Sequence, residues 1–92
     1  MDYMERALEI LDQVEPNADP ATRRAVAREM GRLLDSGKLD EDLENHSADV
    51  EYLISRLSVR EGKDNPTLKV KWNTWVGQMD YIYDGGYNRH QI

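Results

Sequence analysis

His46 and His90 are the only histidines in this chain of 92 residues, and cysteine is absent. His46 lies in a line of apolar residues, where Asp42 four residues earlier can pair with its charged form. One imidazole and one carboxylate are too few ligands for a zinc site. Without a thiol, thiolate metal ligands and a cysteine nucleophile are excluded. We therefore predict neither a metal site nor a cofactor.

The acidic residues near the middle of the chain have the spacing of a calcium-binding loop. Positions 1, 3, 5 and 12 of such a loop are matched by Asp40, Asp42, Glu44 and Glu51. The loop requires glycine at position 6, where this chain has Asn45. Acidic side chains are also favourable in the first turn of a helix, because they oppose its dipole. The pattern therefore indicates the start of a helix rather than a calcium site.

Residue sets for acid–base or nucleophilic catalysis are not recognisable in the sequence. No serine or threonine has an evident base partner, and the Gly85-Gly86 pair follows a predicted helix without opening another. Phosphate-binding glycine loops lie before a helix, where free backbone N–H groups point at the anion. We therefore predict a protein that is not an enzyme.

A basic ladder on the second predicted helix is a candidate for contact with a charged partner. Arg24, Arg28 and Arg32 recur every four residues, which places them on one side of a helix. Such a ladder holds phosphate or an acidic protein, or it stays solvated or pairs with acidic neighbours. The outer side of the first predicted helix offers acidic contact candidates at Glu5, Glu9 and Asp12.

The overall charge argues against a nucleic-acid ligand. The chain has 18 acidic and 12 basic residues, which gives a net charge of −6. Affinity for DNA comes largely from neutralising phosphates with basic side chains. The second and third predicted helices have the length of a helix-turn-helix, but the third opens with three carboxylates at 40–42 that would face phosphates. Direct DNA binding is therefore not expected.

The residues that most resemble a binding surface lie on the last predicted helix, over 66–84. An apolar arc on it includes Trp72 and Trp75, which we predict to be core residues. A second line lies about half a turn away, at Val70, Thr74, Gly77 and Tyr81. Glycine in mid-helix costs about 1 kcal/mol relative to alanine, which suggests close approach of another element. That element is either a neighbouring helix or another molecule, and Tyr87 is a further candidate for partner binding.

Helical periodicity covers most of the chain and predicts an all-α fold. The expected helices cover 2–15, 20–36, 39–61 and 66–84. Asn65-Pro66 is a typical helix start and Gly85 a typical stop. A polar interruption at 45–47 leaves open whether the third helix is broken, with Ser47 as a second cap. Short connections favour a small four-helix bundle with antiparallel neighbours, and the long aromatic C-terminal helix is expected at its centre.

A chain of this length forms one small domain. We assign residues 1–84 to a single helical domain and 85–92 to a flexible C-terminal tail. The first residues are acidic and carry no basic or apolar leader, so no signal peptide is expected. No apolar run approaches the ~20 residues of a membrane span. The expectation is a soluble, cytoplasmic protein that does not associate with membranes.

These features favour a protein that acts by binding another protein or protein complex. The leading hypothesis is a non-enzymatic binding module or small inhibitor that occludes a macromolecular partner, because a small, acidic, cysteine-free chain is typical of phage-type inhibitors of host or defence proteins. One alternative is an acidic nucleic-acid mimic, although the 12 basic residues dilute its charge. The other is a self-associating assembly protein that forms a homodimer through the second line. Salt-dependent partner binding favours the mimic, and concentration-dependent mass favours the assembly protein.

Overall fold

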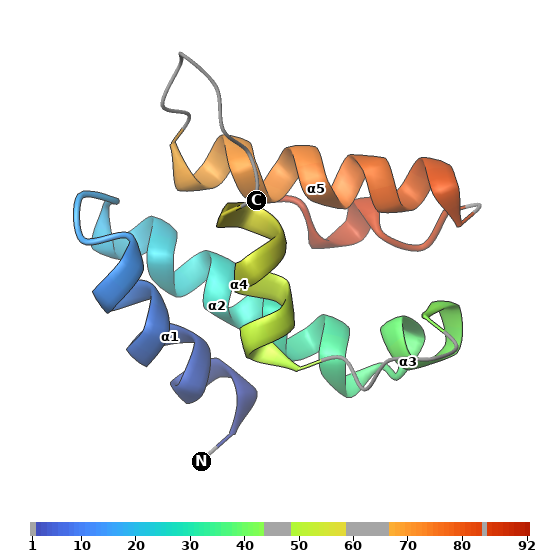
Figure 1. Cartoon of the computed structure of the whole chain (residues 1–92). Coiled ribbons are helices and arrows are strands. Elements are labelled where there is room, and N and C mark those ends of the chain that lie inside the picture. Colours follow the sequence, from blue (N-terminus) through green and yellow to red (C-terminus); the bar gives the residue numbers. More distant parts are fainter. Residues whose placement is uncertain (1, 44–48, 59–66, 84) are drawn as a thin grey trace.

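Every regular element among the described residues is helical. The computed structural model describes residues 2–43, 49–58, 67–83 and 85–92. Within those ranges the elements are α1 (Tyr3–Val14), α2 (Pro20–Asp35), α3 (Lys38–Asp42), α4 (Val50–Ser58), α5 (Leu68–Ile82) and the 3₁₀ turn η1 (Asn88–His90), shown in Figure 1. The prediction of an all-α fold is therefore confirmed. None of these helices is long and apolar enough to span a membrane.

Helix α2 is the element around which the others are arranged. It packs against α1, α3, α4, α5 and η1, whereas α5 packs against α2, α4 and η1. We predicted that the aromatic C-terminal helix is central, and the structure places α2 there instead. The reason is that α2 is buried on several sides from Val26 to Leu34. Its buried residues are Val26, Ala27, Glu29, Met30, Gly31, Leu33 and Leu34.

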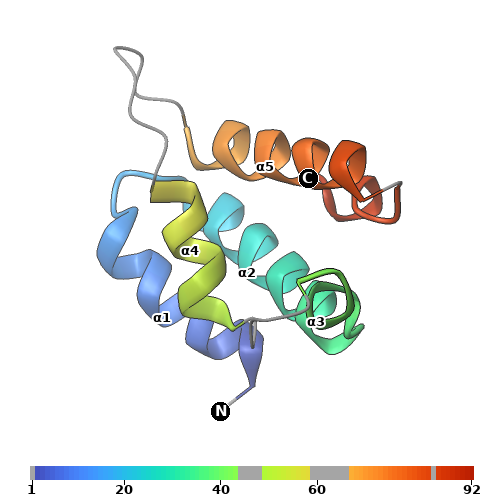
Figure 2. The same ribbon diagram turned by 45° about the vertical axis from the view of Figure 1, so that its right-hand side comes forward.

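Helix α1 packs directly over a glycine of α2, Gly31. The chain reverses direction between the two helices, which then lie side by side (Figures 1 and 2). A Cβ atom added at Gly31 would lie 3.5 Å from the backbone nitrogen of Met4 and 3.7 Å from Cβ of Tyr3. These are ordinary van der Waals distances, so α1 packs directly over Gly31 without excluding a small side chain there. From the sequence we expected close approach at Gly77, by a neighbouring helix or by another molecule, and did not single out Gly31.

The predicted third helix over 39–61 is two helices in the structure. Helix α3 ends at Asp42, because Leu43 leaves the helical region with φ −100° and ψ 69°. Helix α4 starts at Val50, and Oδ1 of Asp49 accepts a hydrogen bond from the Tyr52 backbone N–H at 2.8 Å. The interruption at 45–47, including the alternative cap Ser47, lies outside the described residues.

The line of leucines that suggested one continuous helix has a different explanation. Leu39 comes from α3, while Leu53 and Leu57 come from α4, and all three are almost fully buried. They meet in one core from two separate helices, so their heptad spacing is not the seam of a single helix. Periodicity over a broken segment therefore overestimated the helix length.

Both ends of α5 have identifiable causes. At its start, Oγ1 of Thr67 accepts a hydrogen bond from the Val70 backbone N–H at 3.4 Å. The predicted start at Asn65-Pro66 lies outside the described residues. After its end, Gly85 and Gly86 have φ values of +95° and +93°, a conformation that favours glycine. The left-handed conformation predicted for Gly85 is therefore confirmed, although α5 already ends at Ile82, with Tyr83 as its C-cap.

Residues 85–92, which we assigned to a flexible tail, pack against α2 and α5 in the structure. Tyr87 is fully buried and His90 is 7% exposed. The indole Nε1–H of Trp72 donates a hydrogen bond to the backbone oxygen of His90 at 2.7 Å. The side chain of Asn73 exchanges two hydrogen bonds with the backbone of Ile92, at 2.9 and 2.8 Å. These contacts make the C-terminal segment part of the folded unit.

Candidate functional site

The outer face of α5 is formed by Val70, Thr74, Gly77 and Tyr81. Val70 and Tyr81 on this face, and Ile82 roughly 100° further round the helix, are three of the five large hydrophobic side chains that are exposed in the described structure. Val70 is 50% exposed, Ile82 64% and Tyr81 87%. In Figures 1 and 2 the helix lies across the group formed by α1, α2 and α4, and no described element covers its opposite side. The second line predicted from the sequence is therefore a surface.

The outer face of α5 is poor in negative charge. No Asp or Glu occurs from residue 67 to residue 79, although the chain as a whole is acidic. Lys69 is exposed, while the ammonium of Lys71 lies 2.6 Å from Oε1 of Glu15 and is mostly buried. Asp80 is bound to the C-terminal segment. An apolar side chain on this face therefore has few carboxylates beside it.

Gly77, at the middle of this face, does not meet a neighbouring helix. A Cβ atom added there would find a single neighbour in the described structure, Nε2 of Gln91 at 3.8 Å, which is an ordinary van der Waals distance. Gln91 belongs to the C-terminal segment and is itself exposed. Thr74 and Gly77 are both partly exposed. The middle of the face is therefore bordered by the C-terminal segment but remains open.

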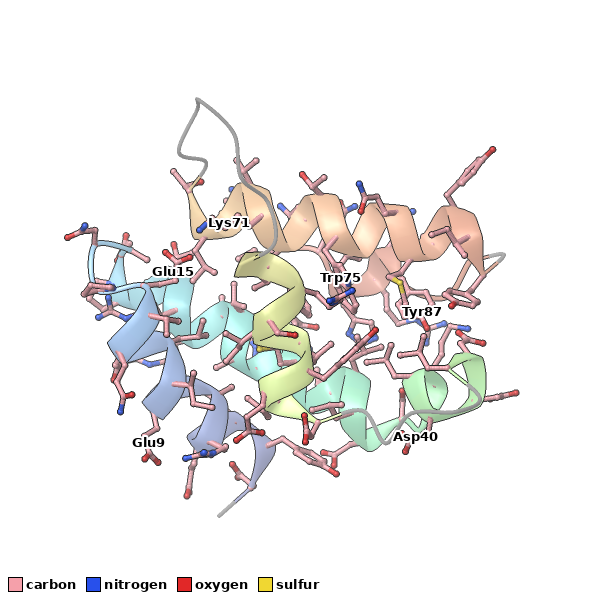
Figure 3. The ribbon with its side chains drawn as sticks, in the orientation of Figure 1. Glu9, Glu15, Asp40, Lys71, Trp75 and Tyr87 are labelled. Atoms are coloured by element: carbon pink, nitrogen blue, oxygen red, sulfur yellow. The ribbon has the colours of Figure 1, made fainter. Side chains whose placement is uncertain are left out.

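The inner face of α5 holds the helix in place. Trp72 is fully buried and Trp75 is 8% exposed, which confirms both as core residues. Their ring centroids lie 5.5 Å apart, and the ring of Trp75 meets that of Tyr87 edge to face at 6.5 Å. In Figure 3 the side chain of Trp75 points from α5 into the interior. Aromatic packing of this kind fixes the rotation of α5 about its axis, so that the outer face points away from the core.

Asp80 fastens the C-terminal segment along one flank of α5. Its Oδ1 accepts hydrogen bonds from the backbone N–H groups of Tyr87 and Asn88, at 3.0 and 3.1 Å. Its Oδ2 accepts one from Nδ2 of Asn88 at 3.0 Å. One carboxylate therefore orders the turn that follows the two glycines. Sequence reasoning missed this role, because the donors are backbone groups that leave no pattern in the sequence.

Tyr87, which we predicted to bind a partner, is a core residue in the structure. Its side chain is fully buried, and its hydroxyl donates a hydrogen bond to Oδ2 of Asp42 at 2.6 Å. The ammonium of Lys38 lies 3.1 Å from the same oxygen and 4.9 Å from the centre of the tyrosine ring. Figure 3 shows Tyr87 between the end of α5 and α3. In this conformation, the side chain is unavailable to a partner.

The environment of this cluster changes the titration of two groups. The hydroxyl of Tyr87 and, after it, the ammonium of Lys38 hold the pKa of Asp42 below its ordinary value of 3.8. Burial raises the pKa of Tyr87 far above its ordinary value, and the hydrogen bond to Asp42 adds to this effect. The cluster is therefore a charged carboxylate that accepts from a neutral phenol. It joins α3 to the C-terminal segment and has no free nucleophile.

A second buried polar pair joins α2 to the C-terminal segment. Nδ1 of His90 lies 3.2 Å from Oε1 of Glu29, and both side chains are less than a tenth exposed. The guanidinium groups of Arg28 and Arg32 approach the other carboxylate oxygen of Glu29, at 3.5 and 3.2 Å. The buried carboxylate therefore has partners on both oxygens. His90 stands out in the sequence as one of two histidines, but its partner Glu29 is 61 residues away and leaves no local signal.

The basic ladder of α2 is only partly free. Arg28 and Arg32 are more than half exposed but are paired with Glu29, whereas Arg24 is exposed on the same side of the helix. The structure therefore gives two of the three arginines an internal partner. This agrees with the interpretation that the ladder pairs with acidic neighbours.

The acidic candidates on α1 are exposed, and two of them are paired. Oε1 of Glu9 lies 3.5 Å from the guanidinium of Arg6, and Oδ1 of Asp12 lies 2.9 Å from Nε of Arg23. Glu5 is exposed in the first turn, where its charge is favourable to the helix dipole. The Arg6–Glu9 pair is exposed and worth at most about 1 kcal/mol, whereas Arg23 beside Asp12 is only 15% exposed. The face stays acidic, and these pairs do not make it a specific site.

A groove of about 420 Å³ lies between the α1–α2 connection and the start of α5. The ion pair of Glu15 and Lys71 lies in its wall, and Figure 3 shows the two side chains pointing toward each other. Asp19, Thr22 and Lys69 also line it. The lining mixes both charges and hydroxyl groups, and the two central charges already neutralise each other. The groove therefore has no chemical preference for one ligand class.

The calcium spacing does not correspond to a shared site in the described structure. Asp42 is bound to Tyr87 and Lys38, and Glu51 lies 2.8 Å from the guanidinium of Arg6. Glu44 and His46 lie outside the described residues. No group of three or more His, Asp or Glu side chains in the described ranges is placed to hold a metal ion.

Comparison with known proteins adds no assignment. No protein-family model matches the chain, and no curated protein or solved structure gives a significant match.

Proposed function

We propose that this protein is a non-enzymatic protein-binding module whose contact surface is the outer face of α5. The observation that carries this proposal is the exposure of Tyr81 and Val70, which are 87% and 50% accessible on a helix that is anchored from its other side. Tyrosine is favoured at protein interfaces because it offers a large, rigid apolar surface and a hydroxyl at its tip.

Because α5 is already anchored in the fold, its outer face can bind a partner without a folding step on binding. Trp72 and Trp75 hold its inner face in the core, and Asp80 and Asn73 tie the C-terminal segment along its flank. A preorganised surface loses little conformational entropy when a partner binds. The module would therefore act by covering part of its partner, in accordance with the occlusion predicted from the sequence.

The nucleic-acid mimic has less support from the arrangement of charges. A mimic needs rows of unpaired carboxylates that imitate phosphates, whereas Glu9, Asp12 and Asp42 each lie beside a basic side chain. The outer face of α5, which is the most apolar exposed helix surface described above, would have no role in such imitation. We therefore favour the protein-binding module.

The test compares two exposed tyrosines on different helices. Tyr81→Ser removes the most exposed anchor on α5, and Tyr3→Ser is the matched control on α1, where the tyrosine is 41% exposed. Tagged protein would be used for affinity capture from its native host, with mass spectrometry of the captured proteins. We expect a specific partner with the unmodified protein and with Tyr3→Ser, and its loss with Tyr81→Ser. Equal capture by all three folded proteins, checked by circular dichroism, would overturn the proposed surface.

A further inference from the structure

The outer face of α5 is symmetric about its own midpoint. Val70 and Tyr81 lie equally far from the centre of the segment 70–81, and so do Thr74 and Gly77. When a second α5 lies antiparallel across this face, Val70 of each copy meets Tyr81 of the other, and Thr74 of each meets Gly77. Two small residues then lie at the centre of the contact and a large side chain lies opposite a smaller one at each end. The face is therefore complementary to itself.

The spacing of these four residues suits two packed helices. Intervals of 4, 3 and 4 residues form a nearly straight line on a helix, as in pairs that cross at about 20°. The small side chains at Thr74 and Gly77 let the two axes approach, and nothing closer than Gln91 borders the glycine in the described structure. Antiparallel helices also place opposite ends of their dipoles together.

The distribution of charge on the molecule favours this face for contact between two copies. Two molecules that each carry a net charge of −6 repel, and the acidic outer side of α1 would increase that repulsion in any contact with itself. The outer face of α5 has no carboxylate from 67 to 79, and the charge of Lys71 is already paired with Glu15. Two copies can therefore meet here without opposing carboxylates.

We propose that a second copy of this chain occupies the outer face of α5, in a two-fold symmetric, antiparallel α5–α5 contact. This inference rests on the proposed function, because it names the protein that binds at that surface. Two-fold dimers with the same patch on both subunits are the commonest soluble oligomers. A helix the length of α5 spans roughly 22 Å, so the interface is small and the dimer is weak and concentration-dependent.

The first measurement is the mass of the unmodified protein over a range of concentrations, by sedimentation equilibrium. The mass is expected to rise from 10.7 kDa towards twice that value as concentration increases. Added salt should strengthen association, because it screens the repulsion between two acidic molecules without weakening an apolar contact. A mass that stays at the monomer value up to millimolar concentration contradicts the proposal.

The second measurement tests the register with two charged variants. Val70→Glu and Tyr81→Lys should each raise the dimer dissociation constant at least roughly tenfold, because each places a charge against an apolar side chain. Mixing the two variants should restore association, since Glu at 70 of one chain then faces Lys at 81 of the other. The opposite end of that mixed contact keeps the native valine and tyrosine. The matched control is Val14→Glu, because this valine is 51% exposed and belongs to α1.

Each outcome decides one point. Loss of association in both single variants, recovery in the mixture and no loss with Val14→Glu support the antiparallel contact. Failure of the mixture to recover, or equal loss with Val14→Glu, overturns it. A protein that stays monomeric but whose capture of a different protein is lost with Tyr81→Ser overturns only this inference. If capture is also unaffected, the proposed function fails as well.

Discussion

Tyr81 and Tyr87 lie close together in sequence but in opposite environments. Tyr81 is 87% exposed on the outer face of α5, while Tyr87 is fully buried in the C-terminal segment and bound to Asp42. Both were candidates for partner binding on residue type alone. The difference arises at Gly85 and Gly86, whose left-handed conformations turn the chain back against α5. Residue type therefore does not separate an anchor for a partner from an anchor for the chain itself.

Helix α5 and the C-terminal segment are held in place by different kinds of contact. The inner side of α5 is held by apolar burial around Trp72, whereas the C-terminal segment is held mainly by polar contacts to Asp80, Asp42 and Glu29. The outer face has neither kind of contact in the described structure. We therefore expect substitutions in the α5 core, in the C-terminal segment and on the outer face to change the free energy of unfolding by different amounts. On the outer face we also expect a change of opposite sign.

The largest effect is expected in the core of α5. Trp72→Ala removes a fully buried indole and its hydrogen bond to the His90 oxygen, so it should lower the free energy of unfolding by about 3–5 kcal/mol. Tyr81→Ala, on the outer face, should change it by no more than about 0.5 kcal/mol. Urea unfolding of both variants gives the two values. Similar losses would mean that the outer face is packed and would remove the basis for a binding surface there.

The next effect is expected at the hydroxyl of Tyr87. Tyr87→Phe keeps the buried ring but removes the donor to Asp42, and loss of a hydrogen bond to a charged group costs about 1.5–3 kcal/mol. Hydrogen exchange should show faster exchange in the C-terminal segment. Tyr83→Phe is the matched control, because that ring lies 6.2 Å from the Tyr87 ring but is only half-buried. Equal effects of the two changes would argue against a specific role for the hydroxyl.

The parts of the fold that could be predicted are those with a local cause. Apolar periodicity placed Trp72 and Trp75 in the core, and the expected helix start at residue 20 agrees with α2, where Oδ1 of Asp19 accepts from the Ala21 backbone N–H. These features depend on residues within a few positions of one another. A pattern read along the chain is sufficient to find them.

The parts that could not be predicted depend on distant partners. Tyr87 with Asp42, and His90 with Glu29, are 45 and 61 residues apart in sequence, and no periodicity connects them. The contacts of residues 85–92 with α2 and α5 could not be predicted for this reason. The close approach of helices falls at Gly31, and nothing local distinguishes that glycine from Gly77.

A smaller effect is expected at low pH, at Asp42. Because its pKa in the folded protein lies below the ordinary value of 3.8, the charged form is favoured by folding. The resulting stabilisation is present above about pH 3.8 and is lost as the pH falls through the lower, folded pKa. Asp42→Asn should therefore be less stable than the unmodified protein at pH 6, with the difference shrinking below pH 3.8. Thermal unfolding at several pH values measures this, and a difference that stays constant would exclude the linkage.

The smallest effect, with the opposite sign, is expected at Gly77. Alanine is favoured over glycine in mid-helix by up to about 1 kcal/mol, and the added Cβ would lie 3.8 Å from Nε2 of Gln91, without a clash. Gly77→Ala should therefore raise the free energy of unfolding of the dilute protein. At Gly31 the added Cβ would also lie at an ordinary van der Waals distance, 3.5 Å from the α1 backbone, but inside a helix contact, so Gly31→Ala is the control and should gain no more than Gly77→Ala. The two melting curves, recorded at low concentration, compare an open helix surface with a helix contact. If Gly77→Ala is instead destabilising while Gly31→Ala is tolerated, the assignment of the two glycines is reversed.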